Sequence, residues 1–156
     1  MTRRVVPDVQ ALGQGMISRQ GPAGMLLEAW TRQEIELITC EEIVLEFEDV
    51  VRRPHIERKF AHITEEAIAT FAAGLRERAV VLAPSSIPRV VPDDPDDDVV
   101  LACAVAGSAE YVVTRDQHLL SLGAIQGIPI VSTEAFARIL RGQVSEPLEL
   151  IYGRRT

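Results

Sequence analysis

Short runs of β-branched and apolar residues alternate along the chain with longer stretches whose apolar residues recur at helical spacing. The short runs predict strands at residues 3–6, 36–39, 79–82, 111–113 and 128–131. The longer stretches predict helices at residues 22–30, 41–53, 64–78, 98–106, 116–121 and 133–141. Because strand–helix–strand units join parallel strands, this alternation predicts an α/β fold, a central parallel sheet flanked by helices on both faces.

The length of the chain and the polar composition of its C-terminal tail predict one folded domain. A chain of 156 residues can bury a core without disulfides or a structural metal. We expect the domain to cover residues 3–141 and a more polar tail, which contains Pro147 and Gly153, to cover residues 142–156. Cys40 and Cys103 lie in apolar settings without a CxxC partner, which predicts two reduced core thiols.

The hydropathy pattern indicates a cytoplasmic protein. No apolar run approaches the roughly 20 residues that cross a bilayer, so we expect no membrane segment. Asp8 interrupts the N-terminal apolar run before the core of a signal peptide could form.

The net charge of −7 argues at first against a nucleic-acid partner, but the acids are concentrated in two places. Seven acids and no base lie in residues 34–50, and five aspartates lie in residues 93–98. Without these twelve, 11 acids stand against 16 Lys and Arg, so the rest of the chain carries a charge of +5. The sequence therefore combines two acidic concentrations with an otherwise basic chain.

Acidic residues also follow the predicted strands, where the ligand crevice of an open parallel sheet lies. Asp8 follows the first strand, Asp116 follows the strand at 111–113, and Asp98 heads the helix after a proline-rich loop. Glu46 lies within a helix, at the edge of its core-facing stripe, and Glu42 one turn earlier fits either the stripe or the solvated face. Each aspartate alone could be a turn or helix-cap residue, so only the joint pattern indicates a site.

Carboxylates that converge on one crevice repel each other unless a cation neutralises them. Oxygen ligands suit Mg²⁺ or Mn²⁺, and the chain has no His/Cys cluster that would favour zinc. A site of this kind can activate water and stabilise the charge that develops on a phosphodiester, so we expect metal-assisted phosphodiester hydrolysis.

Four segments in order resemble the successive motifs of PIN-domain proteins, and most closely those of the toxin components of bacterial toxin-antitoxin systems. The segments are residues 4–10 (RVVPDVQ), 37–47 (LITCEEIVLEF), 94–98 (DPDDD) with Leu101 and Ala102 after it, and 111–116 (YVVTRD) with Leu119 and Leu120 after it. The resemblance spans about residues 3–141 and implies a single PIN-like domain.

This resemblance implies a Mg²⁺- or Mn²⁺-dependent endoribonuclease, the toxin of a toxin-antitoxin system. It places the catalytic and metal-binding acids at Asp8, Glu46, Asp98 and Asp116, with Glu46 holding metal or orienting the attacking water. Thr114 would supply a hydroxyl behind the metal ligands. The implied partners are an RNA substrate and a cognate antitoxin protein, and a homodimer remains open.

Three residues depart from the family pattern. Gln10, expected behind the metal ligands, stands where the family has asparagine, Pro7 replaces an apolar residue and removes a backbone donor, and Val99 stands where lysine is frequent. These departures leave an alternative function open, a catalytically weakened PIN-like module that acts through protein contacts.

Other interpretations have less support. Residues 12–15 (LGQG) lack the third glycine and the acidic residue of a dinucleotide site. A phosphoryl-accepting receiver domain would need a lysine at a strand end, and Lys59 is the only lysine in the chain. His118 could touch substrate. Basic residues could contact RNA phosphates or simply end their helices, and they are Arg52, Arg53, Arg58, Lys59, Arg76 and Arg78.

Overall fold

The computed structural model describes residues 2–55, 62–83 and 95–142, and in residues 95–98 it describes the backbone only. The strands are β1 (Arg3–Pro7), β2 (Ile35–Cys40), β3 (Val80–Leu82), β4 (Tyr111–Thr114), β5 (Ala124–Ile125) and β6 (Ile128–Ser132). The helices are α1 (Val9–Ile17), α2 (Pro22–Thr31), α3 (Glu41–Val51), α5 (Glu65–Arg78), α6 (Pro95–Ala106), α7 (Gln117–Leu122) and α8 (Thr133–Leu140).

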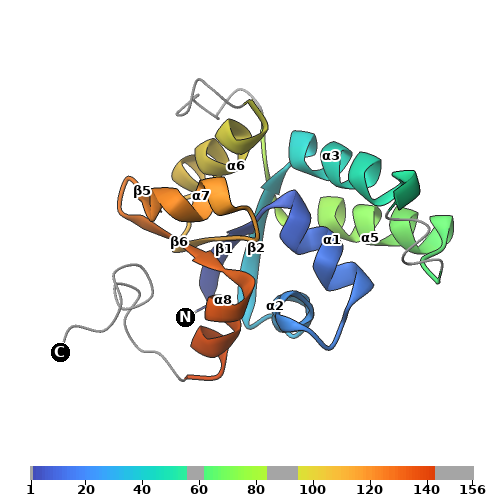
Figure 1. The fold of residues 1–156 in the computed structure, drawn as a ribbon, viewed down its shortest axis with the longest axis horizontal. Coiled ribbons are helices and arrows are strands. Elements are labelled where there is room, and N and C mark those ends of the chain that lie inside the picture. Colours follow the sequence, from blue (N-terminus) through green and yellow to red (C-terminus); the bar gives the residue numbers. More distant parts are fainter. Residues whose placement is uncertain (1, 56–61, 84–94, 143–156) are drawn as a thin grey trace.

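The strands form one sheet of six in the order β3-β2-β1-β4-β6-β5 (Figure 1). β1 to β4 and β6 run parallel, and only the short β5 pairs antiparallel, with β6. β1 lies in the interior of the sheet, with Val5 paired to Leu37 of β2 on one side and to Tyr111 of β4 on the other. The carboxyl ends of β1, β2 and β4 therefore meet at one edge of the sheet.

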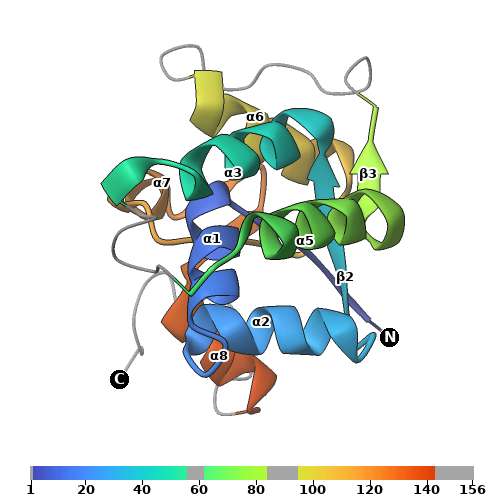
Figure 2. The same ribbon diagram turned by 90° about the vertical axis from the view of Figure 1, so that its right-hand side faces the viewer.

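Helices cover both faces of the sheet. α6 packs on β1, β2 and β4 from one face, while α1, α2, α3, α5 and α8 form a layer on the other. Figure 2 shows α1, α2, α3 and α5 in front of the strands, with α6 behind them. This arrangement confirms the predicted α/β fold with a central, mostly parallel sheet and helices on both faces.

Apolar side chains from the strands and from both helical layers form one core. Phe47, Leu12, Leu37 and Ile38 are fully buried in it, together with Leu101 of α6. The strand β1 contributes Val5 and Val6 to this core and carries the chain directly to Asp8, so the packing that fixes β1 also fixes the position of that carboxylate.

The sequence analysis did not predict α1. It considered residues 12–15 only as a possible dinucleotide-binding motif, and two glycines so close together disfavour a helix interior. The structure places both glycines inside a helix, and Gly15 allows close packing: a Cβ on Gly15 would lie 2.8 Å from the Ala23 carbonyl oxygen of α2. The sequence analysis also missed β5, which has only two residues.

The predicted helix at 98–106 was too short at its start. α6 begins at Pro95, a residue type favoured in the first turn of helices because its missing N–H would have no helical partner there. Asp98 therefore lies in the first turn of α6 instead of heading the helix. Most other predicted boundaries agree with the structure to within one or two residues, and residues 143–156 of the predicted tail lie outside the described residues.

Candidate functional site

Asp8 lies where β1 ends and α1 begins. Its backbone is extended, with φ −78° and ψ 175°, and its side chain caps α1 by accepting a hydrogen bond from the Ala11 N–H at 2.8 Å. Its own N–H donates to the Val113 carbonyl of β4 at 2.9 Å. Asp8 is only 5% exposed, so the strand pairing and the helix cap hold an ionisable group inside the protein.

Thr114 is the last residue of β4, the strand next to β1, and Asp116 comes two residues after it. The fully buried Thr114 hydroxyl donates a hydrogen bond to the Asp8 carboxylate and accepts one from the Asp116 N–H at 2.9 Å. Asp116 in turn caps α7 by accepting from the His118 backbone N–H at 2.8 Å. One hydroxyl thus connects the two acid-bearing turns, and the structure brings these three predicted residues together.

The environment of Asp8 disfavours a negative charge. Burial raises the pKa of its carboxyl from 3.8 to about 6, although the hydrogen bonds from Thr114 and Ala11 act in the opposite direction. The negative charge of Asp116 contributes to this rise in pKa. Either a proton or a cation would relieve the buried charge near neutral pH.

Thr114 lies toward the face of the sheet that α6 covers. Tyr111 contacts Phe136 of α8 on the opposite face, with ring centroids 5.6 Å apart, and side chains alternate along a strand. Thr114, three residues after Tyr111, therefore points toward the α6 face. α6 runs from the carboxyl edge of the sheet to the start of β4, so its first turn, with Asp98, begins at the edge where Asp8 lies.

Two further predicted residues lie on helices that start at this edge. Glu46 is half-buried in the second turn of α3, which follows β2 directly, and Gln10 is exposed in the first turn of α1. The side chain of Asp98 is outside the described part of the structure. Among the side chains that are described, no three His, Cys, Asp or Glu groups are placed to hold a metal ion together.

Pro7 ends β1 at the position where its missing N–H does least harm. The Asp8 N–H donates toward β4, and successive backbone N–H groups in a strand point to opposite sides, so the Pro7 nitrogen faces β2. The register between β1 and β2 ends earlier, at Val5 and Leu37, whereas pairing with β4 continues to Pro7 and Val113. A proline in an interior strand is accommodated because it comes last in that strand.

Several basic residues that could have contacted RNA are paired with acids of the protein. Arg76 of α5 reaches Glu41 and Glu48 of α3, each at 2.7 Å, and Arg52 reaches Glu65 at 2.8 Å. These pairs tie α3 to α5, and sequence analysis missed them because the partners are 13 to 35 residues apart. Arg58 and Lys59 lie outside the described residues.

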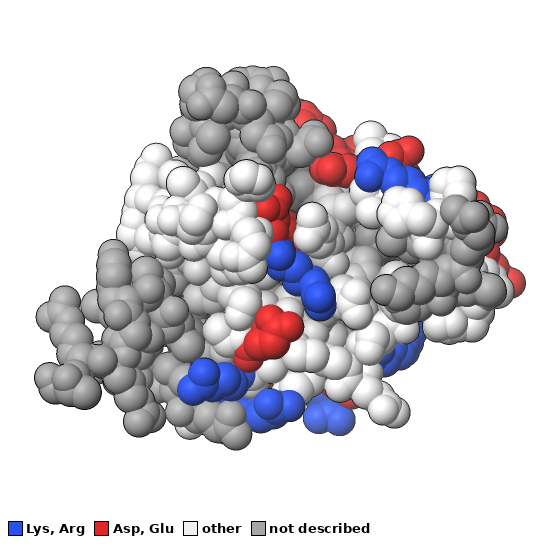
Figure 3. Space-filling model, in the orientation of Figure 1, with Lys and Arg blue, Asp and Glu red and all other residues white. Residues whose placement is uncertain are grey.

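Charge is unevenly distributed on the face shown in Figure 3. Acidic side chains gather on the part of this face that carries α3, close to the start of α6, while basic side chains are more numerous at the lower end, near α2 and α8.

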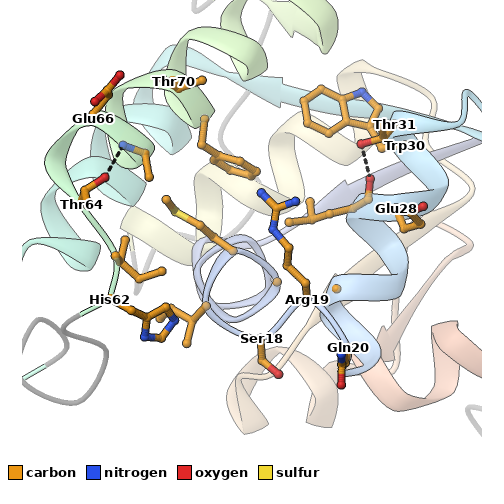
Figure 4. A pocket seen from close by; sticks show the side chains of 18 of the residues that line it. Ser18, Arg19, Gln20, Glu28, Trp30, Thr31, His62, Thr64, Glu66 and Thr70 are labelled. Carbon is orange, nitrogen blue, oxygen red and sulfur yellow. Dashed lines mark hydrogen bonds between the residues drawn. The ribbon is translucent and has the colours of Figure 1, made fainter.

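A separate pocket of about 860 Å³ opens between α1, α2 and the start of α5 (Figure 4). Its apolar wall includes Met16, Leu27 and Phe71, and Trp30 meets Phe71 edge-on with centroids 6.4 Å apart. Figure 4 shows the Arg19 side chain extending into this pocket. Within the described part of the chain the Arg19 guanidinium has no ion-pair partner, and nothing in its sequence context predicted this position.

The remaining chemical groups follow the sequence analysis. Cys40 and Cys103 are free and buried, which confirms the prediction of unbridged core thiols. The side chain of His118 is exposed beside Asp116. In the described ranges, every helix is too short or too polar to cross a bilayer.

A family model described as PIN domain matches residues 4–118, which include β1, β2, α3, α6, β4 and the strand-end acids. A search of curated proteins finds no match.

Proposed function

Because the chain belongs to the PIN domain family, which has a nuclease-type fold, we propose that it is an endoribonuclease that requires Mg²⁺ or Mn²⁺. The observation that carries this proposal is the buried Asp8 carboxylate, tied through Thr114 to the turn that bears Asp116. Acids held at adjacent strand ends of an open parallel sheet lie where such folds bind their ligands.

The donors at this edge suit a hard divalent cation. Asp8 and Asp116 offer carboxylate oxygens, the charge of Asp116 adds to the raised pKa of Asp8, and a cation would favour both ionised forms. We propose that Asp8, Asp98 and Asp116 hold the metal and that Glu46 holds metal or orients the attacking water. When bound, the metal supplies a Lewis acid and lowers the pKa of a bound water.

The protein's own groups would keep this site in place. The Thr114 hydroxyl and the Ala11 N–H each occupy one lone pair of Asp8, which fixes the plane of the carboxylate before any ligand arrives. The cap that Asp116 provides to α7 fixes the second carboxylate in the same way. Gln10 is exposed two residues after Asp8, and we propose that its amide contacts ligand or substrate at the rim.

We further propose that the protein is the toxin of a toxin-antitoxin system and acts on RNA in the cytoplasm. The pocket between α1, α2 and α5 could take this partner without the acidic site being filled, because it lies at the end of α1 remote from Asp8. Its apolar wall and the Arg19 guanidinium fit an apolar partner segment that carries an acidic side chain.

The same pocket favours a second candidate function. A catalytically weakened PIN-like module would retain the partner surface and lose the cleavage. The two functions differ in whether purified protein cleaves RNA, and both require the partner. Reversal of the pocket charge in Arg19→Glu should weaken partner binding, while Arg138→Glu, exposed on α8, should leave it unchanged.

The test of the nuclease is cleavage of a mixed RNA pool with Mn²⁺. We expect wild type and Asp49→Asn, an exposed acid of α3, to cleave, and Asp8→Asn, Asp116→Asn and the EDTA control not to cleave. Full cleavage by folded Asp116→Asn would overturn the proposed site. Absence of cleavage by wild type, with retained partner binding, would support the interaction module instead.

A further inference from the structure

The two cysteines lie opposite each other across the interface between β2 and α6. Cys40 is the last residue of β2 and Cys103 lies on α6, and both are buried, at 1% and 0% exposure. The chain has no other cysteine.

The packing of α6 on β2 explains this placement. A Cβ on Gly107, just after α6, would lie 2.9 Å from a methyl group of Ile38, so the end of α6 rests on Ile38. Two residues along a strand advance by about 6.6 Å. Four residues along a helix advance by about 6 Å and return to the same face. Cys40 comes two residues after Ile38 on β2, and Cys103 comes four residues before Gly107 on α6. Because β2 and α6 run in opposite directions, both steps lead the same way from the Ile38 contact, and the two thiols meet.

The Cys40 and Cys103 thiols lie within reach of a hydrogen bond between them. This bond lowers the pKa of the Cys40 thiol, and the amides of Ile43 and Glu42 at the start of α3 act in the same direction. The same hydrogen bond, together with burial, raises the pKa of Cys103. The pair therefore gives up a first proton at Cys40 and retains the second at Cys103.

We propose that Cys40 and Cys103 form an oxidation site, in which hydrogen peroxide converts the two thiols to an intramolecular disulfide that fixes α6 to the carboxyl end of β2. The Cys40 sulfur attacks one peroxide oxygen, the O–O bond breaks, and a sulfenic acid and one water result. The Cys103 sulfur then attacks the Cys40 sulfur, the S–O bond breaks, and a second water leaves. Overall, two thiols and one peroxide give one disulfide and two waters.

The disulfide would close a long loop, since it joins residues 40 and 103. Cross-links across long loops restrict the unfolded chain strongly and raise the melting temperature. The bond would also hold the helix whose first turn carries Asp98, although the inference does not depend on the proposed nuclease activity.

The experiment counts thiols in the full chain. Folded protein is treated with hydrogen peroxide, denatured and reacted with N-ethylmaleimide, and the labels are counted by mass spectrometry. We expect two labels before treatment, none after it, a monomer on a non-reducing gel, and recovery of both labels with dithiothreitol. Two labels after treatment, labels that dithiothreitol does not restore, or a disulfide-linked dimer would each overturn the inference.

Stability provides the second measurement. We expect oxidised wild type to melt on the order of 5 °C or more above reduced wild type. Cys40→Ala and Cys103→Ala, compared only where they fold under reducing conditions, should show no rise with peroxide. Gly107→Ala keeps both thiols but pushes α6 from Ile38, so it should slow disulfide formation. An equal rise in the single-cysteine variants would contradict the assignment.

Discussion

The Thr114 hydroxyl donates a hydrogen bond to the Asp8 carboxylate across the pairing of β4 with β1, and it accepts one from the Asp116 N–H. A single buried side chain therefore holds both acid-bearing turns. No water is needed to explain how these turns keep their positions, because the hydroxyl uses its donor and an acceptor within the protein.

Thr114→Val tests this connection. The substitution keeps the shape of the side chain but leaves Asp8 and the Asp116 N–H without the hydroxyl, so we expect unfolding to cost about 1–3 kcal/mol less. Thr39→Val is the matched control, because Thr39 is equally buried and its hydroxyl has no partner among the described residues. Urea denaturation measures both, and equal losses in the two variants would contradict the role of Thr114.

The pH dependence of stability without metal reports on Asp8. Its pKa in the folded protein is about 6, above the ordinary 3.8, so the folded state binds this proton more tightly than the unfolded chain. The resulting stabilisation is complete below pH 3.8 and is lost as the pH rises through 6. In EDTA, the difference in unfolding free energy between wild type and Asp8→Asn should change by roughly 3 kcal/mol across this window.

The control for this measurement is Asp49→Asn, an exposed carboxylate. Its stability curve should run parallel to that of wild type between acid and neutral pH. A parallel curve for Asp8→Asn would show that Asp8 has an ordinary pKa in the folded protein.

Divalent metal should stabilise the folded protein. A cation beside Asp8 and Asp116 offsets the repulsion between the two carboxylates. A ligand at a hundredfold excess over its Kd adds about 2.7 kcal/mol to the free energy of unfolding. We expect Mn²⁺ to raise the Tm of wild type and of Asp49→Asn, and to leave Asp8→Asn and Asp116→Asn nearly unchanged. A Tm of wild type that does not respond to Mn²⁺ or Mg²⁺ would contradict a metal site.

Two glycines of α1 should respond in opposite directions to alanine. A Cβ on Gly13 would meet only a Val51 methyl group at 3.6 Å, so Gly13→Ala should stabilise the helix by about 0.5–1 kcal/mol. A Cβ on Gly15 would lie 2.7 Å from a Leu27 methyl group and 2.8 Å from a backbone oxygen, so Gly15→Ala should destabilise by about 1–3 kcal/mol. Thermal denaturation compares them, and equal shifts would contradict the close packing of α1 on α2.

The sequence predicted those parts of the structure that local pattern determines. Asp8 and Asp116 were found because residues that follow parallel strands meet at one edge, and the structure joins them through Thr114. α1 was missed because the close approach that its Gly15 permits involves α2, which a local pattern does not reveal. The ion pairs of Arg76 and the pocket around Arg19 depend on how α5 packs, so no local pattern predicted them.

The roles of the acids remain predictions. Glu46 and Asp98 lie on helices that begin at the same edge as Asp8. Asp98 was selected among the five aspartates of residues 93–98 because it precedes Leu101 and Ala102 at the spacing of the PIN-domain motif.

The position of β1 between β2 and β4 also affects how the protein is made. β2 comes from residues 35–40, but β4 comes from residues 111–114, and the hydrogen bond between Thr114 and Asp8 spans 106 residues. During synthesis, β1 can pair only with β2 until the residues of β4 have been made. Until then, the edge of β1 that will pair with β4 is open, and Asp8 beside it lacks its hydrogen bond from Thr114. Contacts between distant residues form slowly, and the acidic pair is among the last features of the fold to be assembled.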